Sequence, residues 1–97
     1  VQAYDHKVVV LNAEPIDPRH PLLLYICEGL IKGKEVDRVK KTLRRFYPAG
    51  HECWMFGPTY AAAPEAFPLG EMPGRFPEIH PSQIIYIPAW SAGRSRE

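Results

Sequence analysis

The residues of this chain that could carry chemistry are few and widely spaced. The four histidines form no i, i+4 pair and have no Cys-x-x-Cys motif beside them; they are His6, His20, His51 and His80. No serine or cysteine stands at a spacing typical of a nucleophile with its general base. The sequence therefore predicts no self-contained catalytic or metal site. We expect surface or turn histidines, with His51 placed to cap the carbonyl groups of a preceding helix.

One glycine-containing segment superficially resembles a phosphate-binding loop, and it runs from Gly29 to Glu35. Its glycines are one residue too close together, and Glu35 stands where a magnesium-binding hydroxyl is required. An acidic side chain there would repel phosphate. We interpret the segment as a flexible connection between a strand and a helix.

A basic stretch follows, with seven lysines and arginines between Lys32 and Arg45. Glu35 and Asp37 interrupt it, and no aromatic side chains alternate with the bases as a nucleic-acid-stacking surface requires. Because the formal net charge of the chain is only +1, we expect neither a nucleic acid nor a membrane as partner. The bases are interpreted as the solvated face of a helix.

Both cysteines, Cys27 and Cys53, lie in apolar runs that read as neighbouring strands, so we expect buried, reduced thiols. No apolar run reaches the ~18 to 20 residues that span a bilayer, and the N-terminal residues lack the pattern of a signal peptide. The expected location is cytoplasmic. Because numbering begins at Val1 rather than at a methionine, we expect the chain to be part of a longer polypeptide.

The elements that would position any site follow from hydrophobic periodicity. An apolar run from Pro21 to Cys27 is followed by an amphipathic stretch from Lys34 to Phe46, and then by a second run from Glu52 to Phe56. Strand, helix and strand in this order are typical of a parallel sheet with a crossover helix. At 97 residues, the chain is expected to form one α/β domain, spanning positions 1–97.

Three further strands are predicted. The β-branched run from Lys7 to Leu11 favours a buried strand, Gln83 to Ile87 favours the last strand, and the segment from Ala66 to Glu71 contains a proline and a glycine typical of an edge. Residues from Ala61 to Glu65 form either a helical turn or a loop. The expected sheet is mixed but mostly parallel, with about five strands, one main crossover helix and short helices.

Four motifs in this order resemble the C-terminal lobe of a tetrapyrrole methylase domain. The most similar variety is the methylase-like domain fused to nucleotide pyrophosphohydrolases of the MazG type. The motifs are Ile16 to Leu24, Leu43 to His51, Pro68 to Met72, and Ile85 to Pro88. The resemblance extends from about Lys7 to Pro88 and so covers nearly the whole chain.

The resemblance implies part of an S-adenosylmethionine-dependent methyltransferase, acting on a corrin, a porphyrin or an unrelated acceptor. Enzymes of this family are usually homodimers, and the cofactor lies between two lobes. The N-terminal lobe, with the glycine-rich cofactor loop, is absent from this sequence. The C-terminal lobe contributes apolar and main-chain contacts to the cofactor, which nominates Tyr25, Ile26, Cys27, Gly57, Pro58, Thr59 and Ile84.

Two departures from the family pattern leave a rival interpretation open. A glutamine of the MazG-type pattern is missing near Cys27, and the alanines from Ala61 to Ala63 replace a more polar stretch. A methylase-like lobe that has lost the reaction and serves dimerisation or regulation would fit these features. An unrelated small α/β domain that shares only the layout is the third possibility.

Overall fold

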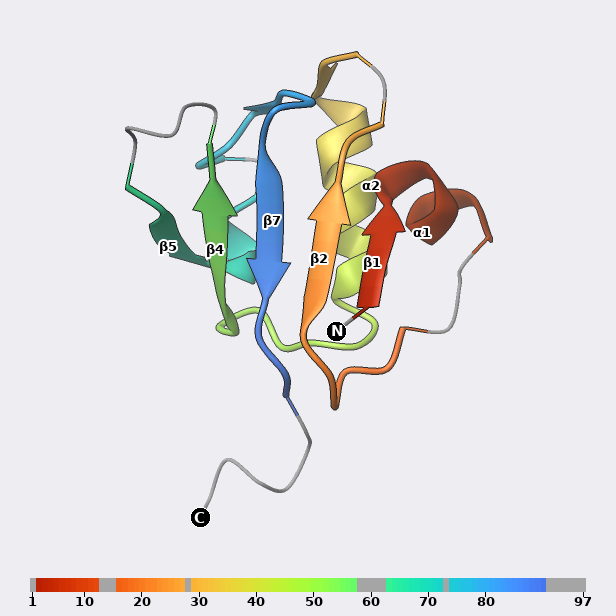
Figure 1. Cartoon of the computed structure of the whole chain (residues 1–97), viewed down its shortest axis with the longest axis vertical. Helices are drawn as coiled ribbons and strands as arrows, with labels where there is room; N and C mark the ends of the chain where they lie inside the picture. The colour runs from red at the N-terminus through yellow and green to blue at the C-terminus, as the bar shows by residue number, and fades with distance from the viewer. Residues whose placement is uncertain (1, 13–15, 28, 58–62, 73, 91–97) are drawn as a thin grey trace.

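A five-stranded mixed sheet with two helices forms the centre of the fold (Figure 1). The computed structural model describes residues 2–12, 16–27, 29–57, 63–72 and 74–90. Its elements are β1 (Gln2–Asp5), α1 (His6–Asn12), β2 (Leu22–Tyr25), β3 (Ile31–Lys32), α2 (Lys34–Leu43), β4 (Glu52–Phe56), β5 (Glu65–Pro68), the 3-10 turn η1 (Leu69–Glu71), β6 (Glu78–Ile79) and β7 (Ile84–Ile87).

The strand order of the main sheet is β1-β2-β7-β4-β5. Only β1 and β2 pair in parallel, whereas β7 pairs antiparallel with both β2 and β4, and β5 pairs antiparallel with β4. The prediction of a mostly parallel sheet is therefore wrong. The physical reason is that the last strand inserts between the two strands that α2 connects. β2 and β4 run in the same direction but do not pair, so the predicted crossover between adjacent parallel strands is not found.

The predicted strand from Lys7 to Leu11 is also wrong, because these residues lie in helix α1. Three consecutive valines favour a strand locally, yet only Val9 is fully buried and Leu11 is 73% exposed. The carboxylate of Asp5 accepts the backbone N–H of Lys7 at 3.1 Å, which helps to start the helix. The strand is instead β1, where Gln2 exchanges side-chain hydrogen bonds with the backbone of Asp17 at 2.6 and 3.2 Å.

Helix α2 confirms the predicted amphipathic stripe, since Val36, Val39 and Leu43 are all buried. The predicted pair between Asp37 and Lys41 is present at 3.2 Å. The helix ends at Leu43, three residues before the predicted Phe46, because a tighter turn follows it. There the N–H of Phe46 donates to the carbonyl of Leu43 at 2.9 Å.

Helix α2 packs on one face of the main sheet, behind the strands in the view of Figure 1. Side chains therefore alternate along each strand between the core and the opposite face. The inward-facing side chains of the three central strands are Leu22, Leu24, Cys53, Met55, Ile85 and Ile87.

Of the remaining predictions about single elements and residues, some are confirmed and others are wrong. The edge strand predicted from Ala66 to Glu71 is confirmed in part: β5 lies at the sheet edge but ends at Pro68, and Leu69–Glu71 form the 3-10 turn η1. Cys53 is buried as predicted, but Cys27 is exposed because β2 ends before it. His51 caps no helix carbonyl: its Nε2 lies 2.7 Å from the carbonyl oxygen of Pro88, and its ring stacks on Tyr47 with centroids 5.0 Å apart.

One prediction falls partly outside the described residues. The helical turn or loop from Ala61 to Glu65 begins outside them, and Glu65 is the first residue of β5. Within the described ranges, no helix is long and apolar enough to cross a bilayer.

Candidate functional site

The predicted cofactor-binding residues that the structure describes gather at one end of the sheet. Strands β2 and β4 end there, and β7 begins there (Figure 1). In the strand register, Ile84 lies opposite both Tyr25 and Phe56. Ile26 and Cys27 directly follow β2, and Gly57 directly follows β4. Pro58 and Thr59 lie outside the described residues.

The side chains at this end form a small apolar surface on the sheet face opposite α2. Tyr25 is 37% exposed, Ile84 40% and Phe56 42%, although all three are large and apolar. Phe56 is not among the residues predicted from the sequence, although the alternation along Glu52–Phe56 places it on the same face as Trp54. Ile26 is buried in the core, so only its backbone could contact a ligand.

A second row lies beside the first on the same face. Leu23, Tyr86 and Trp54 are aligned across β2, β7 and β4 and are half-buried. Together with the row of Tyr25, Ile84 and Phe56, they make the outward face of the central strands predominantly apolar. We call these six residues the open face.

Position 57 requires a glycine because of its backbone conformation and its close contacts within the chain. Its φ is +95°, and a Cβ atom at this position would lie 2.7 Å from the carbonyl oxygen of Ser82 and 3.3 Å from Cα of Gln83. The turn before β7 therefore packs directly on Gly57. Buried Gln83 holds this turn, since its Oε1 accepts the N–H of His80 at 2.8 Å. The glycine fixes where β7 enters the sheet.

Replacing Gly57 by alanine should lower the free energy of unfolding by about 2 to 3 kcal/mol, the sum of a positive-φ cost and a clash with backbone. Gly29→Ala is the matched control, because Gly29 also has a positive φ, +66°, but a Cβ there meets no atom of the described residues within 4 Å. It should cost only about 1 kcal/mol. Urea denaturation measures both. Equal losses for the two variants would contradict the close packing of Ser82 on Gly57.

The chain matches no model of a known protein family. A comparison with curated proteins likewise finds no similar sequence. Function must therefore be inferred from the residues at the sheet end and from the motifs of the sequence.

The sheet end holds little acid-base chemistry. Within the described residues, no group of three or more histidine, cysteine or acidic side chains could hold a metal ion. Cys53 lies near the start of β4 and so away from this end; burial, together with nearby Glu52, raises the pKa of its thiol to about 12, so the thiol stays protonated and unreactive at neutral pH. Asp17, whose pKa is lowered by its hydrogen bonds from Arg19, precedes β2 and so lies toward the other end of the sheet. This arrangement can bind a ligand through shape, apolar contact and main-chain groups.

Proposed function

We propose that this chain is one lobe of a cytoplasmic S-adenosylmethionine-dependent methyltransferase of the tetrapyrrole methylase type, contributing one wall of the cofactor cleft. The observation that carries the proposal is the alignment of Tyr25, Ile84 and Phe56 beside Gly57 at one end of the sheet. Tyr25, Gly57 and Ile84, which the resemblance nominates from the end of one strand, the loop after a second and the last strand, thus lie next to one another. The acceptor would be a corrin, a porphyrin or an unrelated molecule.

The residues present suit the apolar part of such a cofactor. An adenosine group needs apolar, partly aromatic surface with a few main-chain partners, and the exposed faces of Tyr25, Phe56 and Ile84 supply that surface. The backbone after β2 would supply main-chain partners at Ile26 and Cys27. Because the backbone of Ser82 packs directly on Gly57, the role of this glycine would be to fix the shape of the wall.

The bound cofactor would supply an activated methyl group on a sulfonium. Transfer of that group depends mainly on alignment and partial removal of water, so a wall without an acid or base is compatible with the reaction. The side chains of this lobe would exclude water and orient the donor. The substrate-facing side of the cleft would belong to the N-terminal lobe.

The proposal is tested by calorimetric titration with S-adenosylhomocysteine of the polypeptide that carries this chain together with its N-terminal lobe. The intact protein should bind, and Ile84→Asp should weaken binding about ten-fold or more, because a carboxylate disrupts the apolar wall. Leu11→Asp, which changes an exposed leucine on α1, should leave the affinity unchanged. Absence of binding by the intact, folded protein would exclude the methyl-donor site.

The open face favours a second candidate, a non-catalytic methylase-like lobe that serves dimerisation or regulation. Six predominantly apolar side chains on adjacent strands form the kind of surface that a partner lobe or a second copy covers. In this case the chain should self-associate in sedimentation experiments, and Tyr86→Asp should abolish the association. Self-association without S-adenosylhomocysteine binding by the intact protein would support this candidate over the enzyme.

A further inference from the structure

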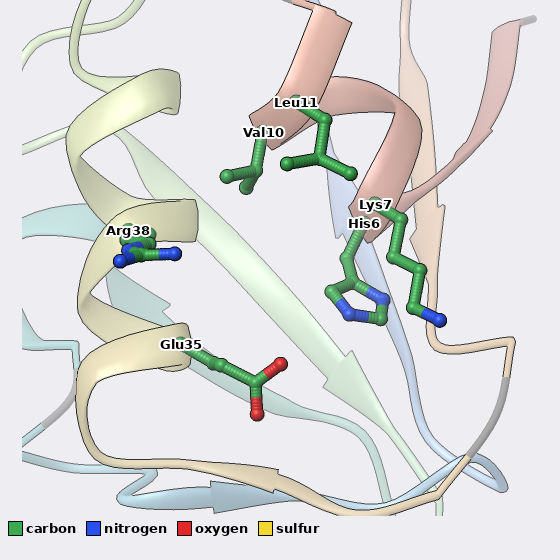
Figure 2. A pocket seen from close by; sticks show the side chains of 6 residues that line it. All are labelled: His6, Lys7, Val10, Leu11, Glu35 and Arg38. Carbon is green, nitrogen blue, oxygen red and sulfur yellow. The ribbon is translucent and has the colours of Figure 1, made fainter.

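A pocket lies between helices α1 and α2, separate from the open face (Figure 2). Four residues of α1 and two of α2 line it; they are His6, Lys7, Val10, Leu11, Glu35 and Arg38. Its volume is about 230 Å³. Since an apolar cavity of about 150 Å³ accommodates benzene, this pocket has room for roughly nine non-hydrogen atoms.

The most informative group in the pocket is the imidazole of His6, which is only 3% exposed. Figure 2 shows the ring lying between the two helices and turned toward Glu35. Its Nε2 is buried and meets no hydrogen-bond partner among the described residues. Most buried polar atoms in proteins have such a partner, because burial removes the hydrogen bond that water would make. A molecule in the pocket can supply the partner that Nε2 lacks.

Access to Nε2 requires a side chain to move, because the atom itself is buried. Glu35 and Arg38 form the α2 side of the pocket, and both are exposed. Exposed side chains change rotamer within nanoseconds. A small molecule can therefore displace them without disturbing the packing of the two helices.

The second ring nitrogen of His6 indicates which chemical group suits the first. Nδ1 lies 3.0 Å from Oδ1 of Asp5, and the same oxygen accepts the N–H of Lys7 at 3.1 Å, which holds the carboxylate in place. Because a carboxylate favours a proton on the nitrogen that faces it, the neutral ring presents Nε2 as an acceptor, and the protonated ring presents it as a donor. A hydroxyl group suits both states, since it can donate and accept. A carboxylate can only accept, and an ammonium group can only donate.

The charges at the pocket favour neither an anion nor a cation. Arg38 brings a positive charge and Glu35 a negative one, and water screens both because both side chains are exposed. Lys7 also lines the pocket, but it takes part in another interaction and is not counted as a free charge. Asp5 is not among the lining residues, and its carboxylate is directed to Nδ1 of His6 and to the start of α1.

We propose that this pocket binds a small uncharged alcohol or phenol, with its hydroxyl at Nε2 of His6 and its apolar part against Val10 and Leu11. The proposal does not depend on the methyl-donor site, because none of its residues belongs to the open face. It assigns Asp5 a positioning role, that of fixing the ring of His6 through Nδ1.

The test uses four probes of similar size on the ¹⁵N-labelled chain: phenol, toluene, benzoate and benzylamine. Two-bond ¹H–¹⁵N spectra report directly on the ring nitrogens of His6, so no variant of this buried residue is required. Phenol should shift the Nε2 signal in a saturable manner. Toluene has the same shape without the hydroxyl and should bind about ten-fold more weakly, which corresponds to about 1.4 kcal/mol, the net contribution of roughly one hydrogen bond. Benzoate and benzylamine should bind no more tightly than toluene.

Variants of exposed residues then locate the ligand. Leu11→Asp places a charge on the apolar wall and should weaken phenol binding about five-fold. Leu30→Asp is the matched control, because Leu30 is also an exposed leucine but does not line the pocket, and it should change nothing. Arg38→Gln and Glu35→Gln should each change the affinity for phenol by less than about two-fold.

Four results would overturn the proposal. Equal affinity for phenol and toluene would remove the role of His6, and tighter binding of benzoate or benzylamine would mean that charge selects the ligand. An unchanged affinity in Leu11→Asp would place phenol elsewhere. Absence of saturation by phenol would leave water as the partner of Nε2.

Discussion

Replacing Ile85 by alanine should lower the free energy of unfolding by about 2 to 5 kcal/mol, a large part of the ~5 to 15 kcal/mol that stabilises a domain of this size. Ile85 is 1% exposed and faces α2 from the middle of the sheet, in register with Leu24 and Met55. Truncation would leave a cavity among three strands. Chemical denaturation of the purified chain measures the loss.

The neighbouring residue provides the matched control, because it has the same side chain on the opposite face. Ile84 is 40% exposed, so Ile84→Ala should cost about 1 kcal/mol or less. If Ile85→Ala fails to fold, Ile85→Val should still show a loss of about 0.5 to 1.5 kcal/mol. A greater loss for Ile84→Ala than for Ile85→Ala would mean that β7 is shifted by one residue and faces the other way.

Raising the pH from 9 to 11 should lower the free energy of unfolding by roughly 3 kcal/mol or more through two buried groups. Burial, with a contribution from Glu52, raises the pKa of Cys53 from its ordinary 9.0 to about 12. Burial, with smaller contributions from Cys53 and Asp17, raises the pKa of Tyr47 from 10.0 to about 12. Below pH 9 both groups are protonated in the folded and the unfolded chain, so neither makes stability depend on pH.

Above pH 9 the unfolded chain releases the Cys53 proton first, and the folded chain retains it. Stability should then fall by about 1.4 kcal/mol per pH unit for each such group, from pH 9 for Cys53 and from pH 10 for Tyr47. Cys53→Ala should remove the fall between pH 9 and 10, and Tyr47→Phe should reduce the fall above pH 10.

Cys27→Ala, which removes the exposed thiol, is the control for the alkaline measurement and should retain the fall of the wild-type chain. Wild-type stability that is constant from pH 8 to 10 would contradict the burial of Cys53 as a protonated thiol.

The hydroxyl of Tyr47 is also buried without a hydrogen-bond partner among the described residues, so Tyr47→Phe should fold at least as well as the wild type at neutral pH.

Local patterns predicted correctly the elements whose stability comes from one amphipathic face. The stripe of Val36, Val39 and Leu43 defines α2. The run Glu52–Phe56 is β4, and Pro68 marks an edge strand. In each case the period of the side chains, or the missing N–H of proline, is compatible with only one type of element or one position in the sheet. No contact with a distant residue is needed to predict it.

The N-terminal segment shows where local patterns fail. Its consecutive valines favour a strand, but the first strand is Gln2–Asp5, which gains its place from pairing with β2 and from the contact of Gln2 with Asp17. The valines then form the short helix that packs on α2 and buries Val9. Pairing with a strand twenty residues away outweighs a propensity of less than ~1 kcal/mol per residue.

The candidate sites divide in the same way. The family resemblance nominated Tyr25, Gly57 and Ile84, and the structure places them at one end of the sheet, whereas Phe56 and the pocket beside His6 were found only in the fold. By itself the sequence determined the α/β class, the helix α2 and the strands that flank it. Only the tertiary structure decided the order and direction of those strands, because insertion of β7 between β2 and β4 depends on contacts across some thirty to sixty residues that no local periodicity encodes.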